Sequence, residues 1–374
     1  MKRIKNWDIL AFLVTYHILL LALLPWVVQH FSWVGVGFFI VTNLLGGLSI
    51  TVGYHRLFSH KTYQAHPIFE AVVLCLATLA FQWSALGWSY DHRKHHTHVD
   101  TDEDPYSIKK GFWYAHFLWL LDYRQQIDES VVDDLVKNPR VMFQHRHFLL
   151  LTIVVNLAVL GLACLFMHPV TALYFSFVLR VFCIHHSTWF INSLAHTWGS
   201  RTYAKELSAV DNAVLALLTF GEGYHNYHHT FANDYRNGVK WWHFDPTKWI
   251  IWTAAKLGWV SNLRRVDNIR LQKIIVRKDL HLISDFFEHH LRHHTDPAAA
   301  AFHQKLSDLY ETFNTQSSRL SRLVVEKRKA ASAETRKLIQ VEMRMIQRQL
   351  RSTWSAWVET TALIGRKYQL EHAH

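Results

Sequence analysis

Histidine is the side chain whose number and spacing stand out, with 28 residues in a chain of 374. An HxxxxH begins at His55, and an HxxHH begins at both His92 and His225. On an α-helix, residues three and four apart share a face, so each HxxHH presents two or three imidazoles to one side. Residues five apart do not, so the HxxxxH predicts a break or loop at a helix end. Because imidazole is the commonest metal-binding side chain, the clusters predict a histidine-rich metal site.

The number of imidazoles in the three clusters predicts two metal ions. Eight are too many for a single tetrahedral zinc; they are His55, His60, His92, His95, His96, His225, His228 and His229. Imidazole binds Zn, Cu, Fe and Ni, so the ligand type alone does not name the metal. A further HxxHH at His290, His293 and His294 lies in a basic region with no companion cluster. We expect a solvated or lipid-headgroup-facing helix there and no catalytic site.

Apolar segments long enough to cross a bilayer flank these clusters. Half of the chain is hydrophobic and only 18% is charged. A membrane core needs about 20 apolar residues as a helix. Four such stretches predict four transmembrane helices: Ile9–Val28, Val34–Val52, Phe148–Met167 and Val170–Ile191. The chain is therefore expected to be an all-α, multi-pass membrane protein.

A fifth apolar stretch, Ile68–Leu86, lies between the first two histidine clusters. If it crossed the membrane, the two clusters would lie on opposite faces and could not share a site. We therefore predict a helix that lies in or dips into the membrane interface. Basic residues at positions 2, 3 and 5 predict a cytoplasmic N-terminus, which places the clusters in a cytoplasmic helical cap.

The last third of the chain differs in character. Residues 261–374 hold 20 basic and 12 acidic residues, a net +8 of the total +11. Apolar residues recur at heptad-like spacing from Phe302 to Leu323 and from Leu338 to Trp357, which predicts two amphipathic helices in an arrangement that suits a hairpin. We predict a membrane domain over 1–260 and a basic helical extension over 261–374. An anionic membrane surface suits this extension better than nucleic acid, for which the chain has no motif.

Three segments resemble the histidine boxes of the membrane fatty-acyl desaturases, most closely the stearoyl-CoA Δ9-desaturase branch. They are HRLFSH at 55–60, DHRKHHTHVDTDEDPYS at 91–107 and GEGYHNYHHTFANDYR at 221–236. The resemblance adds the segment NSLAH, in which His196 would bind a metal directly and Asn192 through water. It implies one iron held by His55, His60, His96 and His229 with Asn192, and a second held by His92, His95, His196, His225 and His228. No catalytic residue beyond these ligands is implied.

The resemblance also implies a function. It predicts O₂-dependent insertion of a cis double bond into a saturated acyl chain, at the Δ9 position of an acyl-CoA, by a non-haem di-iron centre. An acyl-lipid desaturase or related hydroxylase is the alternative, and a histidine-rich metal transporter is a distant one. Since the chain has no flavin, nicotinamide or cytochrome b5 motif, we expect a separate electron donor: a ferredoxin, a rubredoxin or a cytochrome with its reductase. The expected location is a bacterial inner membrane, with the active site on the cytoplasmic face.

For each of two further sets of residues, the sequence leaves two interpretations open. Acidic residues after the second cluster could orient imidazole N–H groups or form a solvated loop; they are Asp100, Asp102, Glu103 and Asp104. His185 and His186 lie within the last apolar stretch, where they could approach the site or form hydrogen bonds in the packing.

Overall fold

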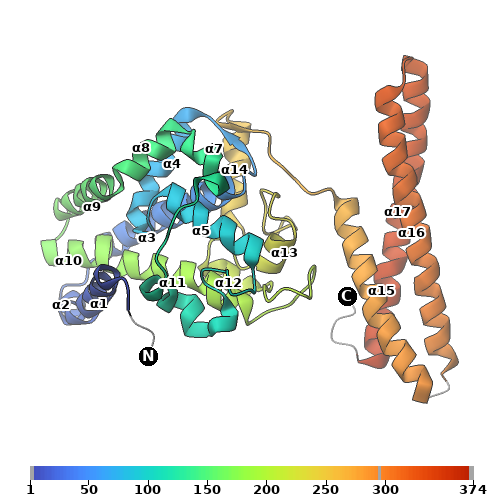
Figure 1. Cartoon of the computed structure of the whole chain (residues 1–374), viewed down its shortest axis with the longest axis horizontal. Coiled ribbons are helices and arrows are strands. Elements are labelled where there is room, and N and C mark those ends of the chain that lie inside the picture. Colours follow the sequence, from blue (N-terminus) through green and yellow to red (C-terminus); the bar gives the residue numbers. More distant parts are fainter. Residues whose placement is uncertain (1–3, 294–295, 370–374) are drawn as a thin grey trace. The chain divides into compact units, whose positions relative to one another are not determined.

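The computed structural model describes residues 4–293 and 296–369, most of them in helices (Figure 1). The chain divides into two compact units, Met1–Arg265 and Val266–His374. The α-helices of the first unit are α1 (Trp7–Ala22), α2 (Leu24–Gln29), α3 (Trp33–Ser49), α4 (Pro67–Ala77), α5 (Ala85–His98), α6 (Trp119–Asp122), α7 (Asp133–Val136), α8 (Pro139–Arg146), α9 (Phe148–Cys164), α10 (Pro169–Leu173), α11 (Leu179–Ser193), α12 (Ala213–Leu218), α13 (His225–Thr230) and α14 (Pro246–Lys256).

Shorter helical segments join or extend these helices. Three are π-helical: η1 (Ile50–Ser59), η4 (Tyr114–Leu118) and η6 (Tyr174–Val178). Four are 3₁₀ turns: η2 (Thr78–Ala80), η3 (Ile108–Lys110), η5 (Glu129–Val132) and η7 (Leu194–His196). Strand β1 (Gln64–Ala65) pairs antiparallel with β2 (Val260–Ser261), and this ties the end of the first unit to the segment after η1.

The predicted membrane spans correspond to helices of the first unit. Three continuous helical stretches are long and apolar enough to cross a bilayer: Trp7–Gln29, Trp33–Ser59 and Pro169–His196. The remaining predicted span, Phe148–Met167, corresponds to α9, which is bent by 79° from α8. These helices turn apolar side chains outward, for example Leu149, which is 71% exposed. Such outward faces suit lipid and not water.

The ambiguous stretch at 68–86 forms two segments and a turn. Helix α4 and the turn η2 cover Pro67–Ala80, and the following helix α5 is bent by 81° from them. Phe81, at the bend, has a positive φ of 54°. The chain therefore turns back near residue 81, which brings His92, on α5, beside His60 at the end of η1, with their Nε2 atoms 2.8 Å apart.

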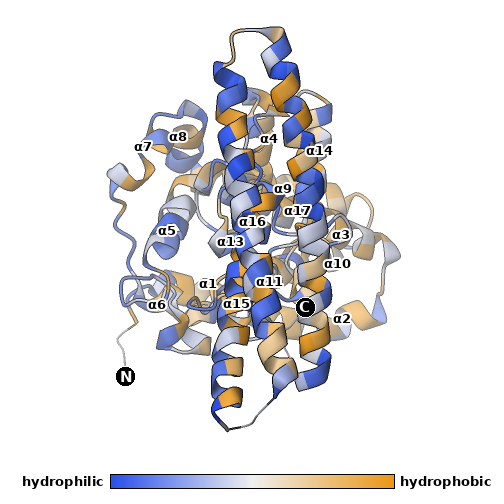
Figure 2. Ribbon diagram, turned by 90° about the vertical axis from the view of Figure 1, so that its right-hand side faces the viewer, coloured by the Kyte–Doolittle hydropathy of each residue, from blue (hydrophilic) through white to orange (hydrophobic). Residues whose placement is uncertain are grey.

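The second unit is built from α15 (Asn268–His293), α16 (Pro297–Lys329) and α17 (Ala333–Tyr368). Hydrophobic and hydrophilic residues alternate along all three helices (Figure 2). The helices α16 and α17 form a hairpin around buried side chains that include Phe313 and Leu350, and α15 adds Phe287 to the core at the other end. Leu338 and Met345, which belong to the apolar repeat in the sequence, are exposed instead.

The buried Arg180 in the last span has the side-chain amide of Asn156 as its hydrogen-bond partner. The Arg180 guanidinium is fully buried, and its Nη2 donates to the Asn156 side-chain oxygen. Its Nε and Nη1 have no hydrogen-bond partner among the described residues. Asn156 in turn donates to the carbonyl of Thr152 at 2.8 Å and to that of Thr78 at 3.3 Å. An arginine buried among apolar helices is costly unless it is paired.

Replacing Asn156 with Leu should therefore lower the free energy of unfolding in detergent by about 3–5 kcal/mol, because it leaves the Arg180 charge buried without a partner. The double variant Asn156→Leu/Arg180→Met removes both polar groups and should recover most of that loss. Equal destabilisation of the single and double variants in denaturant titrations would contradict this account.

Candidate metal centre

Seven of the eight histidines from the three sequence clusters converge with His196 in the first unit, in two groups of four. The first group is His55, His60, His92 and His228, and the second is His95, His196, His225 and His229. Within each group, one nitrogen from every ring lies within 4.8 Å of the others. Each group therefore has the donor set and the dimensions of a metal site with nitrogen ligands.

The π-helical form of η1 explains how the HxxxxH contributes both of its imidazoles. The amide of His60 donates to the carbonyl of His55 at 3.1 Å, a bond between residues five apart. Such bonds define a π-helix, which is frequent at functional sites. It keeps the two rings on one side, with their centroids 4.9 Å apart. The predicted helix end is present, since η1 ends at Ser59 with His60 as its C-cap, but π-helical geometry and not a loop brings the two rings together.

The two remaining residues of the predicted ligand set lie outside both groups. The Nε2 atom of His96 is 2.9 Å from that of His228, and its ring stacks on His229 with centroids 4.2 Å apart. Asn192 is half-buried on α11, four residues before His196. His96 therefore lies between the groups, beside one member of each.

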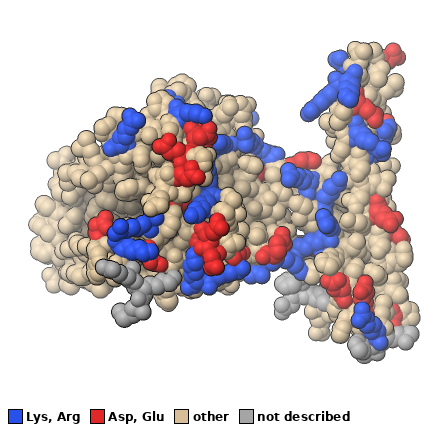
Figure 3. Space-filling view, viewed as in Figure 1, with Lys and Arg blue, Asp and Glu red and all other residues tan. Residues whose placement is uncertain are grey.

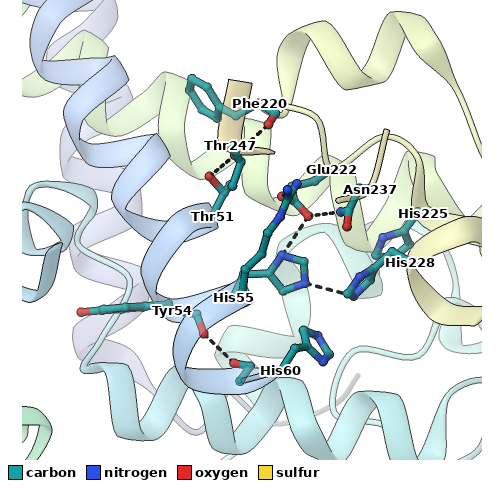
Figure 4. Close-up of polar contacts among 12 residues, drawn as sticks. Thr51, Tyr54, His55, His60, Phe220, Glu222, His225, His228, Asn237 and Thr247 are labelled. Carbon is teal, nitrogen blue, oxygen red and sulfur yellow. Dashed lines mark hydrogen bonds and ion pairs between the residues drawn. The ribbon is translucent and has the colours of Figure 1, made fainter. Parts of the chain in front are cut away.

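The grouping also differs from the partition implied by the resemblance. The structure places His92 and His228 with His55, and it places His229 in the other group. On α13, His225 and His229 are four residues apart and face the same way, with Nε2 atoms 3.1 Å apart. His228 points to a neighbouring side of that helix and reaches His55, with Nε2 atoms 3.0 Å apart (Figure 4).

Hydrogen bonds at the outer nitrogens fix the tautomers of three rings. The Nδ1 atom of His55 lies 2.8 Å from a Glu222 carboxylate oxygen (Figure 4). The Nδ1 atom of His95 lies 2.9 Å from an Asp104 carboxylate oxygen. The Nδ1 atom of His196 lies 2.6 Å from the hydroxyl of Ser208, which itself donates to Asp100 at 2.5 Å. Each Nδ1 must therefore carry the proton, so each neutral ring directs the lone pair of Nε2 inward.

The inward lone pairs exceed the protons available to them. His228 Nε2 faces both His55 at 3.0 Å and His96 at 2.9 Å. His225 Nε2 faces both His196 and His229 at 3.1 Å. One N–H can serve only one of two such neighbours, and two facing lone pairs repel. A cation in each group accepts lone pairs from all its members at once, so the residues fit a pair of metal ions.

The imidazoles of α13 are held neutral, as metal binding requires. His225 and His228 are 2% exposed. Burial, followed by the neighbouring imidazoles, holds the pKa values of His225, His228 and His229 well below the ordinary histidine range. Their nitrogens are therefore free of competing protons at neutral pH.

A buried ionic cluster supports the first group, and the sequence motifs gave it no role. Arg56 lies between Glu222 at 2.9 Å and Asp245 at 3.0 Å, and the three side chains are at most 2% exposed. Asn237 donates to the Glu222 oxygen that also faces His55, at 2.6 Å (Figure 4). Burial alone would raise the pKa of Glu222, but His55 and Arg56 lower it overall, which keeps the carboxylate charged.

Glu222 has a weak signal in the sequence, because it stands between two glycines just before the third cluster. A Cβ at Gly221, whose φ is +100°, would lie 2.8 Å from the Asp245 Cα. A Cβ at Gly223 would lie 2.3 Å from the Ala216 backbone nitrogen. The tight turn that directs Glu222 to His55 therefore requires both glycines.

The acidic stretch after the second cluster serves both of the functions that the sequence left open. Asp104 and Asp100 reach the second group, directly and through Ser208. Asp102 and Glu103 are exposed, and Glu103 pairs with His98 at 3.2 Å.

The histidines of the last span lie outside both groups. The two ring nitrogens of His185 form hydrogen bonds with the Tyr16 hydroxyl at 3.2 Å and the Ala80 carbonyl at 3.0 Å. The ring of His186 forms hydrogen bonds with the rings of His17 and His116. In the second unit, His290 lies 3.4 Å from Asp296, and His294 of that HxxHH lies outside the described residues.

A helical membrane protein that gathers two groups of four imidazoles in its interior, with the outer nitrogen of one ring in each group bonded to a carboxylate, belongs to the class of membrane metalloproteins with histidine ligands. The family model named "Fatty acid desaturase" matches residues 31–261, which include every residue of both groups. The chain belongs to the fatty acid desaturase family, an all-α membrane fold, and this confirms the resemblance found in the sequence.

Several curated relatives are similar to this chain. A "Probable acyl-CoA desaturase" of Schizosaccharomyces pombe is 43% identical over 245 residues, which are 64% of this chain and 51% of that protein. The "Acyl-CoA desaturase 1" of Saccharomyces cerevisiae is 37% identical over 63% of this chain and 47% of its own length. The "sn-2 palmitoyl-lipid 9-desaturase" of a Nostoc species is 36% identical over 68% and 88%. The chain spans about half the length of the two yeast relatives.

Acidification should destabilise the metal-free protein. In the unfolded chain histidine titrates near pH 6.5, whereas the folded pKa values of His225, His228 and His229 lie well below it. The unfolded state therefore binds more protons below about pH 6.5, and stability should fall there by up to about 1.4 kcal/mol per pH unit for each imidazole. Thermal unfolding of chelator-treated protein at a series of pH values measures this slope. It should be smaller in His228→Gln and unchanged in the exposed control His281→Gln, and a flat profile below neutrality would contradict it.

Replacing Glu222 with Gln should lower metal affinity about 10–100-fold, because the neutral amide no longer supports the basicity and orientation of His55. Metal per chain after equilibration with a competing chelator measures the loss. Glu103→Gln is the matched control, since that carboxylate is 70% exposed and contacts neither group. Wild-type metal retention by Glu222→Gln would show that the Glu222–His55 contact does not support the site.

Proposed function

We propose that the two groups of imidazoles hold two iron ions. The proposed ligand set is His55, His60, His92, His95, His96, Asn192, His196, His225, His228 and His229. The observation that carries this proposal is the convergence of Nε2 atoms that outnumber the N–H protons available to bond them to one another. Irons bound there would supply the activation of O₂ that no amino-acid side chain can provide.

The proposed reaction is desaturation of a saturated fatty acyl chain, with a cis double bond formed at the Δ9 position of an acyl-CoA. Two C–H bonds on adjacent carbons are broken, and O₂ with two electrons and two protons becomes two molecules of water. The support for this reaction is membership of the family and the names of the relatives, which include acyl-CoA desaturases and 9-desaturases.

The side chains of this protein would contribute position, charge and exclusion of water. Glu222 and Asp104 hold the Nδ1 protons of His55 and His95, which fixes where each ring directs its lone pair. Six of the eight grouped histidines are buried, among them His95 at 2% exposed, and the other two, His60 and His229, are half-buried. A dry, fixed site of this kind limits loss of a strong oxidant to water.

The acyl carrier has a second candidate. The Nostoc relative is named for a palmitoyl group on a lipid, and its match covers 88% of its length, against 51% for the S. pombe acyl-CoA desaturase. Desaturation of an acyl-lipid uses the same chemistry and differs in the group that carries the chain.

We further propose a separate electron donor, of the ferredoxin, rubredoxin or cytochrome class, because the reaction consumes two electrons that the acyl chain and O₂ do not supply. The protein is a membrane protein, and we propose that the metal centre faces the cytoplasm. The bacterial inner membrane remains a prediction from the sequence, since the relatives come from yeasts as well as cyanobacteria.

Cells that express this chain should gain cis-9 monounsaturated fatty acids, and His229→Ala, which removes one ring of the second group, should abolish them. Double-bond positions are read by mass spectrometry, with His281→Gln as the control for a histidine outside the site. Brief labelling with a saturated fatty acid distinguishes the carrier, because the label appears first as unsaturated acyl-CoA or as unsaturated lipid. Hydroxylated chains would assign the protein to the related hydroxylases, and purified iron-loaded protein that forms no product with a chemical reductant would contradict the proposal.

A further inference from the structure

The positive charge of the second unit is concentrated at one end, where α16 turns into α17. Residues 319–351 contain ten Lys and Arg and three Glu, a net +7. The remaining residues of the unit, 266–318 and 352–374, contain eight basic and nine acidic residues, a net −1. We call the segment 319–351 the hairpin tip. Lys and Arg side chains gather around this end of the unit (Figure 3).

The charge at the hairpin tip is largely unneutralised. Arg319 forms ion pairs with Glu326 at 3.4 Å and with Glu342 at 2.8 Å. Among the described residues, no carboxylate lies within ion-pair distance of the other nine cations of the tip. Two of the three acidic side chains are thus taken up by a single arginine, and the tip presents a strongly positive surface.

An open hollow of about 510 Å³ lies within this surface. Its walls are three cations and two apolar side chains: Lys327, Arg328, Arg336, Val324 and Met343. Lys327 donates to the side chain of Gln340, and Arg336 donates to the carbonyl of Ala330 at 2.9 Å, so both cations are held beside the turn. The combination suits a ligand that carries an anionic phosphate next to an apolar part.

Exposed aliphatic side chains form a stripe beside the cations. Leu338, Val341 and Met345 lie on one face of α17, three and four residues apart, and are 68%, 49% and 52% exposed. Arg344 and Arg348 follow on an adjacent face of the same helix. An apolar stripe flanked by arginines is the pattern of a helix that lies in the headgroup region of a membrane.

We propose that the hairpin tip binds anionic phospholipid at a bilayer surface. The cations of the hollow take the phosphate of a headgroup, and the aliphatic stripe of α17 enters the boundary between headgroups and acyl chains. An acidic protein would account for the charge but gives no reason for three apolar side chains of one helix face to be 49–68% exposed. A bilayer accounts for both, and the first unit, to which the tip is covalently joined, is itself a membrane protein.

The test uses the full chain in nanodiscs of phosphatidylcholine alone or of phosphatidylcholine and phosphatidylglycerol mixed two to one. Hydrogen–deuterium exchange is followed by mass spectrometry in peptides from 324–348, with peptides from 299–313 of the same unit as the internal reference. The anionic lipid should slow exchange of the tip several-fold and leave the reference unchanged, and raised salt should remove the effect.

Two matched triple variants, each of which removes three positive charges, test the location. Lys327→Gln/Arg328→Gln/Arg336→Gln should lose the protection, whereas Arg292→Gln/Lys305→Gln/Arg366→Gln should keep it. Exchange of the reference peptides in phosphatidylcholine reports whether each variant retains the folded bundle, and Leu338→Ser/Val341→Ser, which keeps every charge, should weaken the protection. Equal exchange in the two lipids, equal protection in both triple variants, or slowing only after an acidic electron-transfer protein is added would overturn the proposal.

Discussion

Eight imidazole rings direct a nitrogen toward one another in the interior of the first unit, and much of the surrounding structure keeps them there. A neutral imidazole has one proton, and the position of that proton is decided by whatever its outer nitrogen contacts. Glu222 and Asp104 accept hydrogen bonds from the outer N–H groups of His55 and His95, so the inner nitrogens of these rings are left as acceptors. Without a cation the facing lone pairs repel one another, and a cation bound among them would remove that repulsion.

This requirement explains why the neighbourhood of the site contains so many buried ions. A carboxylate such as Glu222 is costly to bury alone, and Arg56 and Asn237 share its oxygens with His55. Arg56 in turn needs Asp245, whose oxygens also accept from the backbone amides of Lys248, Asn237 and Gly238. Each partner satisfies the next, so the fold holds a charged network away from water with hydrogen bonds at nearly every position.

The sequence was informative where chemistry follows helical periodicity. The spacing of His225 and His229 on α13 predicts their common face, and the structure has both in one group. It was misleading at His55 and His60, because a π-helix brings together residues that an α-helix would separate, and no single residue type announces that geometry. It gave only a weak signal for Glu222, whose role depends on contacts with residues far away in the chain. Apolar length identified the spans, but the bend at residue 81 depends on tertiary packing.

Neutral ligands and charged outer partners together set the electrical balance of such a centre. Eight imidazoles bring no negative charge to two divalent cations, so the positive charge must be compensated from farther out. The carboxylates of Glu222 and Asp104 lie one hydrogen bond from the ring nitrogens, and Asp100 lies behind Ser208. Held there, they would reduce the net charge of a metal-loaded site without themselves serving as ligands. The imidazoles that they orient would then form a rigid ligand shell, and the metal would not need a carboxylate bound directly to it.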